Sequence, residues 1–125
     1  MTGDARGGLT GRSLLITGTT GIAAATARRA AAEGARVCVT GIDAASGIAL
    51  CESVRGDGGA CRFVEADVTD ARAVAAAVDA CVEAYGRVDA VFNVVGISGR
   101  RFGDGPLHEC TDDGWDRTLE VNLRG

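Results

Sequence analysis

The chain has 125 residues, with 13 basic and 17 acidic side chains and a formal net charge of −4 at pH 7. Apolar residues make up 46% of it, which argues against disorder and allows a single folded domain. The acidic balance and the lack of any Lys/Arg-rich stretch argue against a nucleic-acid binder. No apolar run approaches the roughly 20 residues of a membrane helix, and the N-terminus lacks the apolar core of a secretory signal. We therefore expect a cytoplasmic protein with no membrane partner.

The cysteines number five, which is odd, and no two of them have the C-x-x-C spacing. This pattern indicates neither a disulfide framework nor a zinc site, so no metal is expected. We expect reduced thiols that act as small apolar side chains.

Short β-rich runs alternate with longer helical stretches along the chain. The runs that predict strands cover residues 13–17, 36–40, 61–65 and 88–95. The stretches that predict helices cover residues 22–33, 44–54, 70–85 and 111–121. Asp70 and Thr111 are expected to cap the last two helices, and Gly86 to end the helix that Asp70 begins. Trp115 is expected to be a packing residue of the last helix. Residues 1–12, rich in Gly, Thr and Arg, are expected to form a flexible leader before one domain at 13–125.

This alternation is typical of βαβ units and a parallel sheet. We expect an α/β fold, a Rossmann-like doubly wound parallel sheet of about four strands with helices on both faces. The fourth run is apolar at consecutive positions, a pattern typical of a strand that is buried on both faces.

A glycine turn, Thr17-Gly18-Thr19-Thr20-Gly21-Ile22-Ala23-Ala24, separates the first strand from the first helix. A dinucleotide-binding turn needs glycine for the tight bend and for close approach of the pyrophosphate, and small residues for helix packing. The phosphates then meet the free N–H groups of the helix. A plain tight turn is the alternative for such a motif.

Several motifs in the right order resemble the short-chain dehydrogenase/reductase family, from about Leu14 to Gly125. They are the glycine turn, Asp67-Val68 after the third strand, Asn93-Val94-Val95-Gly96 after the fourth, and Trp115-Asp116 with Val121-Asn122-Leu123-Arg124-Gly125. Two departures stand out. Only two residues separate Gly18 from Gly21, where ordinary members have three, and Val94 and Val95 replace Asn and Ala. The shorter turn shifts the N–H groups that cradle phosphate.

The resemblance implies a role for each matched residue. Cofactor binding is implied for Gly18, Thr19, Gly21, Ile22, Asp67, Val68, Asn93 and Gly96. Asp67 and Val68 would place adenine, although Asp67 could instead cap the following turn. Asn93 is the sort of residue that more often joins strands than touches a ligand. Asn122 matches the asparagine that helps to order a proton-relay water, a catalytic helper, and its alternative is a plain polar residue near a helix end.

Cofactor choice in this family depends on the end of the second strand, where an acidic residue binds the ribose of NAD and an arginine accepts the 2′-phosphate of NADP. Gly41 occupies the expected acidic position, and Asp43 follows two residues later. Asp43 could reach the ribose or cap the next helix. Since Thr20 is not basic either, the cofactor is NAD or NADP with a weak preference for NAD.

The chemistry of the family needs a Ser, a Tyr and a Lys that this chain does not supply. It contains no lysine, and Tyr85 is not in a Y-x-x-x-K motif. The main hypothesis is the cofactor-binding part of an NAD(P)-dependent oxidoreductase. The alternatives are a non-catalytic nucleotide-binding module and a scaffold or interaction protein with a degenerate form of this fold.

The resemblance also implies a strand order of 3-2-1-4, which leaves the apolar fourth strand at an edge. An exposed edge of this kind invites pairing with another strand. We therefore expect a homo-oligomer or a further chain that covers this edge.

Overall fold

The computed structural model describes residues 8–125. The strands are β1 (Ser13–Thr17), β2 (Arg36–Gly41), β3 (Ala60–Glu65) and β4 (Ala90–Asn93). The α-helices are α1 (Gly21–Ala32), α2 (Ala44–Gly56), α3 (Ala71–Tyr85) and α4 (Asp112–Leu119). A 3₁₀ turn, η1 (Gly99–Phe102), precedes α4, and a π-helical turn, η2 (Glu120–Arg124), follows it.

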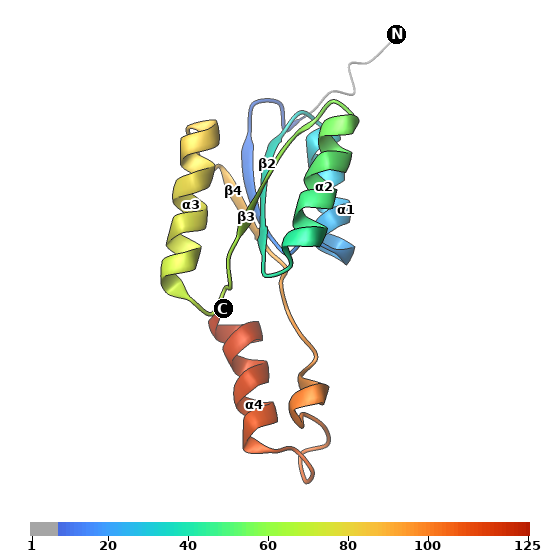
Figure 1. The fold of residues 1–125 in the computed structure, drawn as a ribbon, viewed down its shortest axis with the longest axis vertical. Coiled ribbons are helices and arrows are strands. Elements are labelled where there is room, and N and C mark those ends of the chain that lie inside the picture. Colours follow the sequence, from blue (N-terminus) through green and yellow to red (C-terminus); the bar gives the residue numbers. More distant parts are fainter. Residues whose placement is uncertain (1–7) are drawn as a thin grey trace.

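The strands form one parallel sheet in the order β3-β2-β1-β4. Helices α1 and α2 lie on one face of this sheet and α3 lies on the other (Figure 1). The prediction of a Rossmann-like doubly wound sheet with helices on both faces is therefore confirmed. After β3 the chain returns to the other side of β1, so the order reverses between β1 and β4.

The larger part of the core lies between the sheet and the α1/α2 layer. Ile16, Val37 and Val39 are completely buried there. Helix α1 faces them with alanines, including Ala23 and Ala27, and these small side chains let the helix backbone approach the strands. A smaller cluster on the α3 face joins residues of β1, β2 and α3, namely Leu15, Cys38 and Cys81.

Strand β4 is shorter than the predicted 88–95 and has one free edge. The ladder ends at Asn93 because the amides of Val94 and Val95 turn to the hydroxyl oxygen of Thr17, at 3.0 and 3.3 Å. Every residue of β4 is exposed. The edge position is as expected, and it leaves the apolar side chains of Val91 and Phe92 60% and 38% exposed.

The segment before β1 is attached to the domain from Leu9 onward. Leu9 packs against the core, Gly11 donates to the carbonyl of Gly34 at 3.3 Å, and Arg36 donates to the carbonyl of Arg12 at 2.8 Å. The flexible leader at residues 1–12 stays a prediction. Residues 1–7 of that predicted leader lie outside the described residues.

Residues 97–125, here called the distal lobe, extend beyond the carboxyl ends of the strands (Figure 1). Within it α4 packs on η1 and contacts no strand. The hydroxyl of Thr111 caps α4 by accepting from the amide of Gly114 at 3.1 Å, as predicted. Trp115, predicted to be a packing residue, is 53% exposed because α4 has no sheet beneath it. No helix among residues 8–125 is long and apolar enough to cross a membrane.

Candidate functional site

Two hollows open at the carboxyl ends of the strands, where open α/β sheets bind ligands. The first has a volume of about 210 Å³ and lies between the glycine turn and the residues that follow β4. Its lining consists of Gly18, Thr20, Ile22, Ala23, Val94, Val95 and Gly96. This hollow, here called the turn hollow, therefore lies where the strand order reverses.

The N-terminus of α1 points its first amides toward the turn hollow without a side-chain cap. Thr20 is the N-cap residue, and its hydroxyl accepts no hydrogen bond from the helix. Helices α2, α3 and α4, in contrast, are capped by Asp43, Asp70 and Thr111. Free first-turn amides and the positive end of the helix dipole are the features that hold phosphate.

The shortened glycine turn is tightly packed against α1. Gly18 has φ +113° and Gly21 has φ +53°, backbone conformations that favour glycine. A Cβ on Gly18 would lie 2.9 Å from the Cβ of Ala23. The shorter turn is therefore compatible with a small residue at Ala23, and any side chain at Gly18 would push the turn away from the helix.

Thr19, predicted to bind the cofactor, turns toward α2 instead of lining the turn hollow. Its hydroxyl lies 2.6 Å from the hydroxyl of Ser46. A Cβ on Gly41 would lie 3.2 Å from the Cγ2 of Thr19. Thr19 thus occupies space beside Gly41, the position where the resemblance implies an acidic side chain.

The second hollow is a cavity of about 200 Å³ between the sheet and the distal lobe, and it is mainly apolar. The sheet side supplies Gly41, Ile42, Ala66, Asp67 and Val68, and the residues after β4 supply Val95. The distal lobe supplies Ile97, Arg101, Phe102, Arg117 and Val121. This cavity, here called the lobe cavity, meets the turn hollow at Val95, which lines both.

Asp67 lies in the wall of the lobe cavity and also holds a turn. Its Oδ1 accepts hydrogen bonds from the amide of Thr69 at 2.9 Å and from the hydroxyl of Thr69 at 2.7 Å. These two bonds lower the pKa of Asp67 below its ordinary value, so the carboxylate is charged at neutral pH. Asp67 therefore combines the turn-capping role with a position in the wall of the lobe cavity.

Asp43 caps α2. Its Oδ1 accepts from the amides of Ala45 at 3.0 Å and Ser46 at 3.3 Å. It lines neither of the two hollows. Of the two alternatives for this residue, the structure contains the helix cap.

Both asparagines hold the segment that links the sheet to the distal lobe. Asn93 accepts a hydrogen bond from the hydroxyl of Thr17 at 2.6 Å, which joins β4 to β1. Asn122 accepts from the amide of Ile97 at 2.8 Å and donates to its carbonyl at 2.9 Å. A Cβ on Gly96 would lie 3.0 Å from the Oδ1 of Asn122, so this glycine permits the close approach of η2.

The lining residues of the lobe cavity that sequence reasoning missed include Arg101, Phe102 and Arg117. The guanidinium groups of Arg101 and Arg117 lie 4.8 and 5.4 Å from the ring centroid of Phe102. Arg117 pairs with Asp113 at 3.6 Å, while Arg101 has no carboxylate partner among residues 8–125. Only the fold brings these loop and helix positions together, and no spacing in the sequence indicates it.

Comparison with known proteins places this arrangement in a family. The enoyl-(acyl carrier protein) reductase family matches residues 16–125. D-threitol dehydrogenase from Mycolicibacterium smegmatis is 39% identical over 118 residues, which cover 94% of this chain and 44% of that protein.

Solved structures agree with this match. A short-chain dehydrogenase from Mycobacterium smegmatis superposes with a TM-score of 0.86 at 35% identity, covering 95% of this chain and 50% of that one. A metagenomic short-chain oxidoreductase in complex with NADP has a TM-score of 0.82 at 32% identity, covering 93% and 52%. The chain spans about half the length of these relatives. It belongs to the short-chain dehydrogenase/reductase family.

Proposed function

We propose that this chain is the dinucleotide-binding part of an NAD(P)-dependent oxidoreductase and that the cofactor lies across both hollows. The observation that carries the proposal is that the turn hollow and the lobe cavity adjoin at Val95, at the carboxyl ends of the strands. A dinucleotide has two parts that match this pair, a charged pyrophosphate and a flat apolar adenine. The solved relative in complex with NADP supports this use of the fold.

The residues present fit such a cofactor. The uncapped amides of α1 would hold the pyrophosphate beside Gly18 and Gly21. The apolar walls of the lobe cavity would exclude water from adenine, and the charged Asp67 would accept a hydrogen bond from its amino group. When bound, the nicotinamide supplies a hydride acceptor or donor.

Asn122 positions the backbone beside Gly96 and takes no direct part in proton transfer. Both polar atoms of its amide are engaged with the backbone of Ile97, so it fixes the path of the chain beside Gly96. The Tyr that serves as acid and base in this family, and the Lys four residues later that lowers the pKa of that Tyr, are not among these 125 residues. Hydride transfer therefore needs groups that this sequence does not contain.

For the choice of cofactor we retain the preference for NAD. One oxygen of Asp43 is engaged as a helix cap, and the other oxygen is available to a ribose hydroxyl beyond Ile42. The negative charge of Asp43 would repel the 2′-phosphate of NADP. Arg101 and Arg117, which line the same cavity as Gly41, are the observation that favours NADP instead.

The test is calorimetric titration of the purified chain with NADH and with NADPH, after circular dichroism has shown that it is folded. We expect binding of NADH and a weakening of about tenfold in Asp67→Ala, since a hydrogen bond to a charged group contributes about 1.5 kcal/mol. Asp79→Ala removes another exposed carboxylate, on α3 and outside both hollows, and is the matched control.

Each outcome of the titration has a distinct meaning. If NADPH binds more tightly than NADH and Arg101→Ala removes this difference in affinity, the preference for NAD is wrong. Arg101 then binds the 2′-phosphate. Absence of binding to either dinucleotide by the folded chain refutes the proposal and leaves the scaffold alternative.

We also propose that the free edge of β4 is covered by a second copy of this chain or by further strands. Val91 and Phe92 are exposed along it, at 60% and 38%. Light scattering after size exclusion tests the first case. A monomer at every concentration, with no loss of solubility, would refute pairing between copies.

A further inference from the structure

Two buried cysteines of α2 and β3 face each other in the core. The Sγ atoms of Cys51 and Cys61 lie 2.9 Å apart. The two residues are 1% and 4% exposed. The tight turn at Gly56–Gly59 reverses the chain between helix and strand, and this reversal brings together two thiols that are ten residues apart in the sequence.

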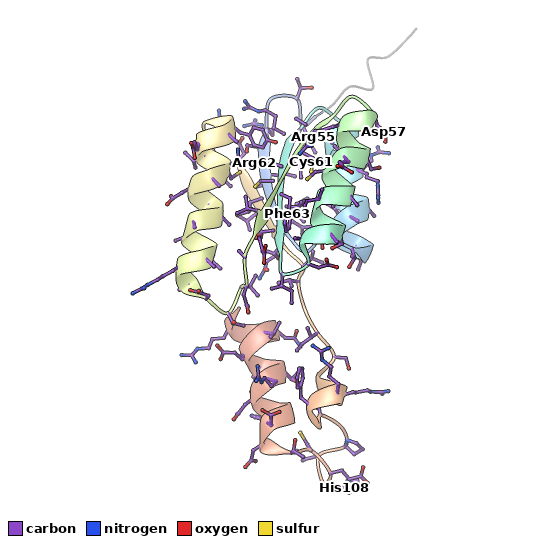
Figure 2. All side chains as sticks on the ribbon, viewed as in Figure 1. Arg55, Asp57, Cys61, Arg62, Phe63 and His108 are labelled. Atoms are coloured by element: carbon purple, nitrogen blue, oxygen red, sulfur yellow. The ribbon has the colours of Figure 1, made fainter. Side chains whose placement is uncertain are left out.

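A neighbouring arginine makes the electrostatic environment of this pair unequal. The Nε of Arg55 donates to the carbonyl of Cys61 at 3.0 Å, and Figure 2 shows both residues at the same end of α2 and β3. The hydrogen bond from the Cys61 thiol lowers the pKa of Cys51, burial opposes this, and the guanidinium adds to the lowering. The pKa of Cys61 is raised by the same hydrogen bond and by burial. Cys51 is thus the thiol of the pair that loses its proton more readily.

Among the other cysteines, Cys38 also has a thiol partner, since its side chain is hydrogen-bonded to that of Cys81. Burial raises the pKa of Cys38 to about 12, so it stays protonated. Cys81 lies 3.5 Å from the hydroxyl of Ser13. Cys110 is half-buried in the distal lobe and contacts Asp104 at 3.9 Å. Cys51 is the cysteine that combines a lowered pKa with a second thiol in direct contact.

We propose that Cys51 and Cys61 form an oxidative modification site, at which a hydroperoxide converts the two thiols into a disulfide between α2 and β3. The Cys51 thiolate attacks one peroxide oxygen, the O–O bond breaks, and hydroxide leaves and takes a proton to become water. The Cys51 sulfur is then a sulfenic acid. The Cys61 sulfur attacks it, the S–S bond forms, the S–O bond breaks, and a second water leaves with the thiol proton. The two sulfurs lose two electrons in total and the peroxide gains them.

The disulfide would link helix α2 covalently to the edge strand β3. Each of these elements has one end next to residues that line the lobe cavity. Helix α2 follows Gly41 and Ile42, and β3 leads directly to Ala66 and Asp67. A thiol pair that senses peroxide would therefore fix two walls of this cavity relative to each other. This link does not depend on the proposed cofactor role.

The experiment treats the folded chain with hydrogen peroxide, blocks the remaining thiols with iodoacetamide in denaturant, and maps them by protease digestion and mass spectrometry. We expect a peptide pair joined through Cys51 and Cys61, 2 Da lighter than the reduced pair, while Cys38 and Cys81 become alkylated. Treatment with dithiothreitol should restore both thiols. The same oxidation in denaturant is the control, because pairing of an unfolded chain is not selective.

Variants test the assignment further. Cys51→Ser and Cys61→Ser should each abolish the 2 Da loss, whereas Cys110→Ser should leave it unchanged. Full alkylation of Cys51 and Cys61 after peroxide treatment of the folded wild-type chain, or preferential pairing of other cysteines, overturns the proposal. The wild-type map decides the question even if a serine variant does not fold.

Discussion

Packing between α2 and β3 depends on one glycine inside the helix. Gly47 is buried in α2, and a Cβ built on it would lie 2.6 Å from the Cγ of Phe63 and closer still to two other ring carbons. Figure 2 labels Phe63 on β3, the strand beside this helix. The substitution Gly47→Ala therefore forces the ring of Phe63, or the helix, to move.

The expected cost follows from two opposing terms. Overpacking a core site costs about 1–3 kcal/mol, and contact with several atoms of a rigid ring places this site near 3 kcal/mol. Alanine in place of glycine inside a helix returns about 1 kcal/mol. The free energy of unfolding should therefore fall by about 2 kcal/mol, which lowers the Tm by about 8 °C in a domain of this size.

Thermal and urea unfolding followed by circular dichroism measure this change. The control is Gly56→Ala at the end of the same helix, where a Cβ would meet nothing within 4 Å. It should raise stability by about 0.4–1 kcal/mol. Phe63→Leu makes room beside the helix, so the double variant Gly47→Ala/Phe63→Leu should be more stable than the sum of the single changes predicts.

Two results would contradict this reasoning. A Tm for Gly47→Ala that equals or exceeds that of Gly56→Ala would show that α2 does not approach β3 as closely as described. Simple additivity in the double variant would show that the loss of stability does not arise from contact with the ring of Phe63.

Three further variants test separate contacts. Asp43→Ala should lower the free energy of unfolding by about 1 kcal/mol through loss of the α2 cap, with Asp43→Ser close to wild type in the same urea titration. Tyr85→Phe should cost about 0.5–1.5 kcal/mol in thermal unfolding, because the hydroxyl of Tyr85 donates to the carbonyl of Val37 at 3.2 Å. Asp89 accepts from the amide of Ser13, which lowers its pKa below 3.8. Its contribution is thus present above pH 3.8 and is lost as the pH falls through the lowered pKa. Asp89→Asn should therefore be less stable than wild type at neutral pH, and the difference in urea midpoint should shrink in acid.

The sequence predicts the sheet well because its signals are local. Alternation of β-rich runs and alanine-rich stretches gives β1, β2 and β3 within one residue at either end. Asp70 caps α3 and Gly86 ends it in a left-handed conformation, as predicted. Side-chain chemistry at helix ends depends on neighbours within a few residues, so it can be predicted without the fold.

The candidate site could be predicted only in part, since it depends on distant segments. The glycine turn and Asp67 are visible in the sequence, and both line hollows in the structure. The contribution of Arg101 and Phe102 is not visible, because it arises only where the distal lobe meets the sheet. Trp115 was misjudged for a related reason, since a large aromatic side chain is buried only if its helix has a layer to pack on.

The distal lobe meets the sheet along the walls of the lobe cavity, and α4 rests on no strand. The hydrogen bonds between Asn122 and Ile97 lie within the lobe itself. Opening this lobe therefore breaks few buried contacts, and its amides should exchange with deuterium faster than those of β1 and β2. A molecule in the lobe cavity would contact both the sheet side and the distal lobe. Part of its binding free energy would therefore be used to immobilise the lobe. Affinity at this cavity and slow hydrogen exchange in α4 are thus two measures of the same equilibrium.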